Sequence, residues 1–138
     1  MRELTLEATV DALDSVIQFV NDHLKSSDCP VKVQVQIDIA IEEIFVNIAN
    51  YAYNPNTGAA TVRVEVGGEP QRVTLTFIDN GVPYDPLGKP DPDISLSAED
   101  RKIGGLGILM VKRSMDNITY EYKDGSNILT IEKKLNAV

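Results

Sequence analysis

The sequence VKVQVQIDIAIEEIFVNIANYAY, from Val31 to Tyr53, determines the central element of this chain. Over its first half, valine and isoleucine stand at every second position, which is the pattern of a half-buried strand. The same stretch also contains a helical stripe, in which Ile37, Ile41 and Ile44 recur three or four positions apart. No turn-forming residue interrupts about twenty positions, a length that favours a helix over a strand. We therefore expect a helix over residues 31–53.

One strand and one further helix are expected before this stretch. Residues 3–9 alternate between apolar and polar side chains, as in a half-buried strand. Residues 10–24 carry apolar side chains at helical spacing and predict an amphipathic helix. The members of that apolar stripe are Val10, Leu13, Ile17, Val20 and Leu24. Residues 26–30 are expected to form a turn.

The second half of the chain predicts four strands, one short helix and a long irregular segment. In order, these are strands at 61–66 and 72–78, an irregular segment at 79–103, a helix at 107–114, and strands at about 117–122 and 127–135. Glycine-containing turns join the two strand pairs as hairpins. The irregular segment holds four prolines, and a segment of this length is usually functional. The order predicts an α/β fold, an α+β two-layer sandwich with helices on one face of an antiparallel or mixed sheet.

Composition and charge narrow the class of protein. The length of 138 residues suits a single domain, expected over residues 1–138. The N-terminus does not resemble a signal peptide, and no apolar run approaches the roughly 18 residues of a membrane span, so a cytoplasmic location is expected. One cysteine and one histidine leave little material for a soft-metal site. A net charge of −8 argues against nucleic acid but not against a nucleotide.

Two short motifs carry side chains suited to nucleotide chemistry. Glu43 and Asn47 are four residues apart and share one face of the predicted helix. An amide oxygen is a suitable ligand for magnesium, and a carboxylate can orient or deprotonate a nucleophile. The apolar strand at 72–78 ends in Asp79-Asn80-Gly81, where Asp79 could read a base edge and Gly81 keeps a side chain out of the ligand's path.

A glycine-rich turn, Gly104-Gly105-Leu106-Gly107, opens the helix after the irregular segment. Glycines let backbone amides approach phosphate oxygens, and a helix N-terminus favours their negative charge. The turn matches neither the dinucleotide fingerprint nor a Walker A loop. Taken singly, the three motifs are also typical of a solvated helix face, a turn and a hinge. Their order along one chain favours a nucleotide site.

With these motifs the sequence resembles a known superfamily. The segments EEIFVNIANYAY (42–53), DNGVPYDP (79–86) and GGLGILMVKRSMDNITY (104–120) look like the N, G1 and G2 boxes of the GHKL, or Bergerat-fold, ATPases. Within that superfamily the chain is similar to the small anti-sigma-factor serine/threonine kinases, the RsbW-like group. The resemblance implies a Bergerat-type mixed, mainly antiparallel sheet and an ATP lid at about 82–103.

The resemblance also implies a role for the residues of the first two motifs. Glu43 would act as general base, and Asn47 would bind magnesium. Asp79 would accept a hydrogen bond from the adenine amino group, with Gly81 lining the same pocket.

The remaining motif residues receive their roles in the same way. Gly105 and Gly107 would face the phosphates, and Thr130 on a late strand would support the adenine contact. Two features depart from the family's pattern: Tyr51 stands where many relatives have a histidine, and residues 10–24 contain no arginine with which some relatives grip partners. The partner surface is therefore left open.

The resemblance implies an ATP- and magnesium-dependent protein kinase. It would phosphorylate a serine or threonine of a small antagonist protein and act as an anti-sigma factor, as a homodimer without direct contact to nucleic acid or membrane. The alternative is a nucleotide-gated protein-binding module of the same fold without significant kinase activity. The ATP-binding half of a histidine kinase and a scaffold without a nucleotide are further alternatives, the former weakened because His23 is the only histidine.

Overall fold

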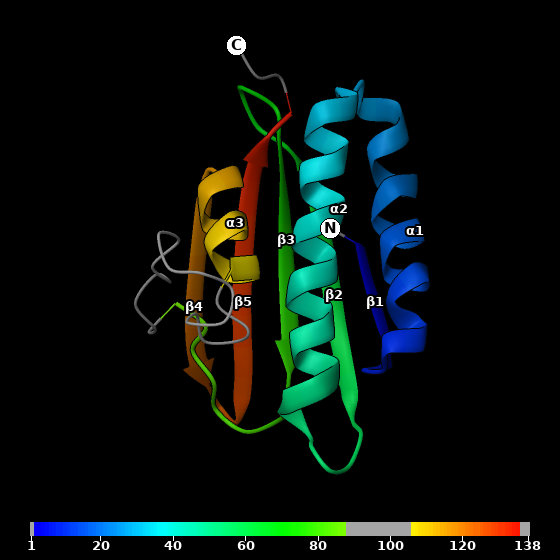
Figure 1. Ribbon diagram of the computed structural model, residues 1–138. Coiled ribbons are helices and arrows are strands. Elements are labelled where there is room, and N and C mark those ends of the chain that lie inside the picture. Colours follow the sequence, from blue (N-terminus) through cyan, green and yellow to red (C-terminus); the bar gives the residue numbers. More distant parts are fainter. Residues whose placement is uncertain (1, 88–105, 136–138) are drawn as a thin grey trace.

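Within the residues that the computed structural model describes, 2–87 and 106–135, five strands form one sheet and three α-helices lie across one of its faces (Figure 1). The strands are β1 (Arg2–Glu7), β2 (Ala59–Gly67), β3 (Arg72–Asp79), β4 (Asn117–Lys123) and β5 (Ser126–Lys134). The helices are α1 (Leu13–Leu24), α2 (Val31–Asn47) and α3 (Leu106–Ser114). The expected two-layer α/β sandwich is confirmed, and each strand pairing described is antiparallel.

Helix α2 begins at Val31, so the helical pattern prevails over the alternating one from the first residue. A helix turns about 100° per residue, and alternate residues therefore do not share a face. Val35 is 49% exposed, whereas Ile37, two positions later, is fully buried at 0%. The alternation thus places β-branched side chains on both faces of one helix. After Asn47 the helix continues as a π-helical turn, Ile48–Ala52. Helix α2 and this turn together cover almost all of the expected helix, residues 31–53.

The first predicted helix begins later than expected. Residues Val10–Ala12 form a separate 3₁₀ turn, and α1 begins at Leu13. Val10 is consequently 53% exposed and does not belong to the apolar stripe. The buried positions of α1 are Val16, Val20 and Leu24. None of the helices in the described part of the chain is long and apolar enough to span a bilayer.

Both predicted hairpins form. In the second, Lys123 pairs with Ser126 and leaves a two-residue turn between β4 and β5. Its residues, Asp124 and Gly125, have φ angles of 53° and 80°. Left-handed conformations at both central positions are typical of the tight turn that matches the twist of antiparallel strands. The Asp-Gly dipeptide therefore fixes the register of this hairpin.

The core lies between the helices and the covered face of the sheet. Alternate residues of β2, β3 and β5 supply the sheet's side of this core, because successive side chains of a strand point to opposite faces. These buried residues are Val62, Val64, Val73, Leu75, Phe77, Leu129 and Ile131. The central helix α2 packs on them through Ile37, Ile41 and Phe45.

The central pair of strands is not consecutive in the chain. The sheet has the order β1-β2-β3-β5-β4, so β3 pairs with β5 although α3 and β4 come between them in the sequence. In this register Asp79, the last residue of β3, faces Asn127 near the start of β5. The C-terminal end of α2 lies over the same end of the sheet (Figure 1). The polar groups of the sequence motifs therefore meet at one end of the fold.

A pair of substitutions on α2 tests which pattern governs this segment. We expect Ile37→Ala to lower the free energy of unfolding by about 2–4 kcal/mol, because it leaves a cavity in the core. Val35→Ala should change it by no more than about 0.5 kcal/mol, because that side chain faces solvent and alanine is a better helix former. Urea denaturation measures both values. Equal losses at the two positions would contradict the helical assignment.

Candidate functional site

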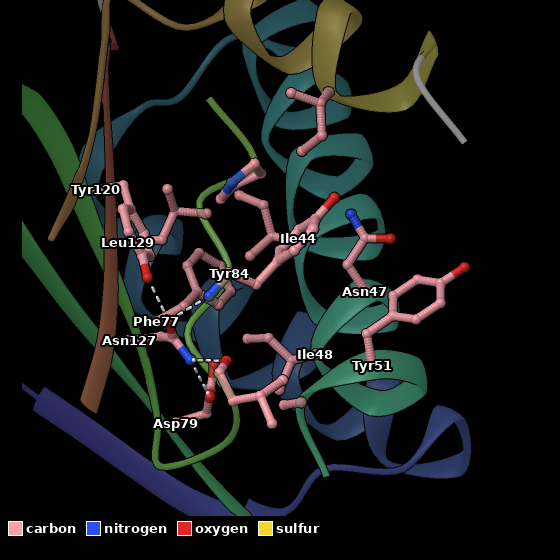
Figure 2. Close-up of a pocket in the computed structure, with 14 residues that line it drawn as sticks. Ile44, Asn47, Ile48, Tyr51, Phe77, Asp79, Tyr84, Tyr120, Asn127 and Leu129 are labelled. Carbon is pink, nitrogen blue, oxygen red and sulfur yellow. Dashed lines mark hydrogen bonds between the residues drawn. The ribbon is translucent and has the colours of Figure 1, made fainter. Parts of the chain in front are cut away.

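A pocket opens beside the C-terminal half of α2, above the ends of β3 and β5 (Figure 2). Its volume is about 480 Å³, open mouth included. The lining combines aliphatic and aromatic side chains with a few polar ones, as is typical of small-molecule sites. The polar and tyrosine residues of the lining are Asn47, Asp79, Asn127, Tyr51, Tyr84 and Tyr120. Two of the predicted site residues, Asn47 and Asp79, are therefore on the walls of one pocket.

The Asp79 carboxylate is buried at the pocket wall, with 6% of the residue exposed. Its Oδ1 accepts hydrogen bonds from the backbone N–H of Gly81, at 2.9 Å, and from Nδ2 of Asn127, at 2.9 Å. Among the residues that the structure describes, Oδ2 has no hydrogen-bond partner. Buried polar atoms nearly always have one. The free acceptor oxygen is thus suited to a ligand that donates a hydrogen bond, such as an exocyclic amine.

Asn127 is a buried polar residue that the sequence motifs did not single out. Its Nδ2 donates to Oδ1 of Asp79 and to the carbonyl oxygen of Val82, at 2.9 and 2.8 Å. Its Oδ1 accepts from the backbone N–H of Tyr84, at 3.1 Å, and from the Tyr120 hydroxyl. Figure 2 shows this amide among three of its partners. The one sequence signal for it is a polar residue at the second position after a hairpin turn, and that signal is common.

The structure changes the expectation for Thr130. This residue stands between Leu129 and Ile131, which both point into the core. Because side chains alternate along a strand, Thr130 points to the opposite, helix-free face and does not line the pocket. The β5 residue that contacts Asp79 is instead Asn127, three positions earlier.

The turn after β3 is held against the end of the π-helical turn. A β-carbon at Gly81 would overlap the carbonyl group of Ala52, so only glycine fits this approach. The next residue, Val82, donates its backbone N–H to the same Ala52 carbonyl at 2.9 Å. The Tyr53 hydroxyl accepts from the Asn80 N–H at 2.8 Å and donates to the carbonyl of Ala59 at 2.6 Å. Gly81 therefore acts by allowing backbone contact beside the pocket.

Glu43 and Asn47 lie on the side of α2 that faces α3. The two side chains are neighbours, with Nδ2 of Asn47 donating to Oε1 of Glu43 at 3.5 Å. A β-carbon at Gly107, in the first turn of α3, would overlap the Glu43 carboxylate. Thus Glu43, Asn47 and Gly107, which come from two of the three motifs, meet at one edge of the pocket. A side chain at position 107 would displace the carboxylate.

Some of the expected features lie outside the described residues. Gly104, Gly105 and most of the predicted lid, residues 88–103, belong to this part. The start of the predicted lid, residues 82–87, is described and contributes Val82, Tyr84 and Pro86 to the pocket.

The site has a limited supply of metal ligands. Across residues 2–87 and 106–135, no three or more histidine, cysteine, aspartate or glutamate side chains cluster in a way that could hold a metal ion. Magnesium commonly binds through one or two protein oxygens together with substrate phosphates and water. Asn47 and Glu43 suit that mode of binding and do not form a complete protein cage.

The Tyr120 phenol is positioned as a neutral hydrogen-bond donor. Burial raises its pKa, and the negative charges of Asp85 and Asp79 raise the pKa further, whereas a backbone hydrogen bond with Tyr84 lowers it. The hydroxyl therefore keeps its proton at neutral pH. It donates that proton to Oδ1 of Asn127, which helps to fix the orientation of the amide.

Comparisons with known proteins agree with the fold and identify a family. The family model described as "Histidine kinase-like ATPase domain" matches residues 6–133. Serine/threonine-protein kinase BtrW of Bordetella bronchiseptica is 28% identical over 130 residues, which cover 94% of this chain and 89% of that protein. Serine-protein kinase RsbW of Bacillus cereus is 32% identical over 95 residues, which cover 66% of this chain and 58% of that protein.

A solved structure supports the same fold. The RsbU and RsbW domains of Rv1364c from Mycobacterium tuberculosis superpose with a TM-score of 0.63 at 15% identity, over 98% of this chain and 33% of that chain. The chain therefore belongs to the histidine kinase-like ATPase domain family. Within that family it is similar to the RsbW-like GHKL group, which the three motifs also resemble.

The close approach at Gly81 can be tested by substitution. We expect Gly81→Ala to lower the free energy of unfolding by about 1–3 kcal/mol, because the added methyl group meets backbone that cannot move aside. Gly67→Ala is the control, since a β-carbon there meets nothing within 4 Å. Thermal unfolding measures both variants. A Gly81→Ala protein as stable as Gly67→Ala would show that the end of α2 is not packed on this turn.

Proposed function

We propose that this protein binds ATP with magnesium and transfers the γ-phosphoryl group to a serine or threonine of a small antagonist protein, while also acting as an anti-sigma factor. The observation that carries the proposal is the placement of Glu43, Asn47 and Gly107 at one edge of a pocket whose wall holds buried Asp79. The similar proteins BtrW and RsbW are named as protein kinases, which supports kinase activity.

The base of the nucleotide fits the end of the pocket at Asp79. The adenine amino group would donate to Oδ2 of Asp79, the oxygen left without a partner in the described part of the chain. Apolar side chains such as Phe77 and Leu129 line the same end and suit the faces of a purine. A base with an oxygen in place of the amino group would set two acceptors against each other.

The phosphates fit the other end, beside Asn47 and the start of α3. The first N–H groups of a helix have no partner within the helix and favour negative charge. Gly107 lies in this first turn and allows a close backbone approach. Asn47 would be the protein ligand of magnesium, and the ion when bound would neutralise phosphate charge. Phosphate oxygens would complete its coordination.

Glu43 is the general base in this proposal. Its carboxylate is next to Asn47 and in contact range of the start of α3, which puts it beside the expected phosphates. There it would accept the proton of the acceptor hydroxyl as that oxygen bonds to the γ-phosphorus and the bond from that phosphorus to the leaving ADP breaks. The Asn47 amide, which donates to Oε1, would help to keep the carboxylate in place.

The second candidate is a nucleotide-gated binding module without significant catalysis. The observation that favours it is Tyr51, which lines the pocket and is 57% exposed at the position where many relatives have a histidine. Calorimetric binding of ATP and magnesium without turnover, together with capture of a partner, would favour the module over the kinase.

Phosphoryl transfer is tested with labelled ATP, magnesium and a candidate antagonist domain. We expect Glu43→Ala to reduce transfer by about 100-fold or more, the usual contribution of a general base. Glu42→Ala is the matched control, because that side chain is the exposed neighbour on the same helix and should keep its activity. Absence of transfer by the wild type, or full transfer by Glu43→Ala, would contradict the kinase assignment.

Nucleotide binding is tested separately from transfer. We expect Asp79→Asn to weaken the affinity for ATP by about tenfold or more, since an amide offers the base one acceptor fewer. Asp14→Asn, an exposed position on α1 with the same change in charge, should bind ATP as the wild type does. Isothermal titration calorimetry gives both dissociation constants. Equal dissociation constants for the two variants would show that Asp79 does not contact the base.

A further inference from the structure

We propose that Asn127 is a positioning residue. It couples recognition of the base at Asp79 to residues 82–87, which follow the turn after β3 and are here called the strap. The inference rests on the proposed function, because it assigns the base to Asp79. It adds a residue that the motifs do not contain and a physical link between the base and the beginning of the predicted lid.

The amide of Asn127 uses its full hydrogen-bonding capacity. A side-chain amide has two N–H donors and two acceptor lone pairs. Both donors are used, one on the Asp79 carboxylate and one on the Val82 carbonyl. Both lone pairs are used as well, by the Tyr84 N–H and the Tyr120 hydroxyl. One buried side chain thus joins β3, β4 and the strap.

The partners allow a single orientation of this amide. If the side chain were turned over, its oxygen would face the Asp79 carboxylate and the Val82 carbonyl, which are both acceptors. Its NH₂ group would then face the Tyr84 N–H, which is a donor. Unpaired polar groups at a buried site are costly, so the flipped state is disfavoured. Asn127 is therefore a rigid connection.

The connection directs the Asp79 carboxylate. Asn127 and the Gly81 N–H both donate to Oδ1, and together they leave Oδ2 as the oxygen that can meet a ligand. Without Asn127 the carboxylate keeps the Gly81 contact alone and can rotate about its Cβ–Cγ bond. The preference for a base that donates at this point should then weaken, because the acceptor is no longer held in one direction.

The same connection holds the start of the strap. The Val82 carbonyl and the Tyr84 N–H both bond to Asn127, whereas the Val82 N–H bonds to the carbonyl of Ala52. A base that donates a hydrogen bond to Asp79 stabilises the orientation of its carboxylate. Because that carboxylate is bonded to the Asn127 amide, the amide and the strap are stabilised as well. Coupling of this kind is reciprocal, so an ordered strap must also favour the matching base.

The test uses Asn127→Leu, which keeps the branching of the side chain at Cγ and removes all four hydrogen bonds. The first measurement is the ratio of affinities for ATP and GTP, with magnesium, by calorimetry. The second is amide hydrogen exchange of Tyr84 and Val82 by NMR, with and without ATP. Ser126→Ala is the control, because it removes a hydrogen bond to Asn80 at the neighbouring position of β5 and leaves Asn127 intact.

We expect the wild type and Ser126→Ala to prefer ATP and to show slower Tyr84 exchange when ATP is bound. In Asn127→Leu the ATP-to-GTP ratio should fall at least tenfold and ATP should no longer protect Tyr84. The Val82 N–H, which bonds to Ala52, should keep its protection. A residue of merely structural importance would lower the melting temperature and leave the affinity ratio unchanged.

Each failure has its own outcome. If Asn127→Leu retains the wild-type affinity ratio and the protection of Tyr84, the inference is overturned while the proposed function stands. If the wild type binds neither nucleotide, the proposed function fails and this inference fails with it. Should the leucine variant not fold, Asn127→Ser, a smaller polar replacement, is held to the same affinity-ratio test.

Discussion

The antiparallel pairing of β3 with β5 is the constraint on which the site depends. It brings together two strands that α3 and β4 separate in the sequence, and its register sets Asp79 opposite Asn127. A shift of one residue would turn every side chain of β5 to the other face of the sheet. Asn127 would then leave the pocket and Leu129 would leave the core. The packing of the core and the chemistry of the pocket therefore depend on the same register.

The helical spacing of residues in α2 gives the helix one face for the core and another side for the site. Its inward face packs Ile37, Ile41 and Phe45 on the sheet, and its side toward α3 presents Glu43 and Asn47. Because both sets belong to one rigid helix, core packing positions the polar pair. The end of the helix is anchored in turn, since the Ala52 carbonyl accepts from Val82 and leaves room only for glycine at position 81.

Sequence reasoning succeeded where the signal is local and failed where it depends on pairing between distant segments. The neighbourhood of Glu43 and Asn47 follows from helical spacing, and the Asp-Gly hairpin turn follows from its two residues. The contact of Asp79 with Asn127 could not be read in this way, because it needs the partner strand and its register. Thr130 was expected at the adenine contact from the family resemblance alone, and strand alternation turns its side chain to the opposite face. The start of α1 was missed because a 3₁₀ turn continues the helical spacing back to Val10.

The alternating run at the start of α2 has a consequence for the unfolded chain. Detached from the sheet, residues 31–41 combine β-branched side chains, strict alternation and few charges, which is the composition of segments that associate into intermolecular β-structure. Formation of α2 prevents this association, because the helix places the valines and isoleucines of the segment on two different faces. Refolding at high protein concentration is thus a competition between burial within one molecule and aggregation between molecules, and a dilute solution favours the native helix.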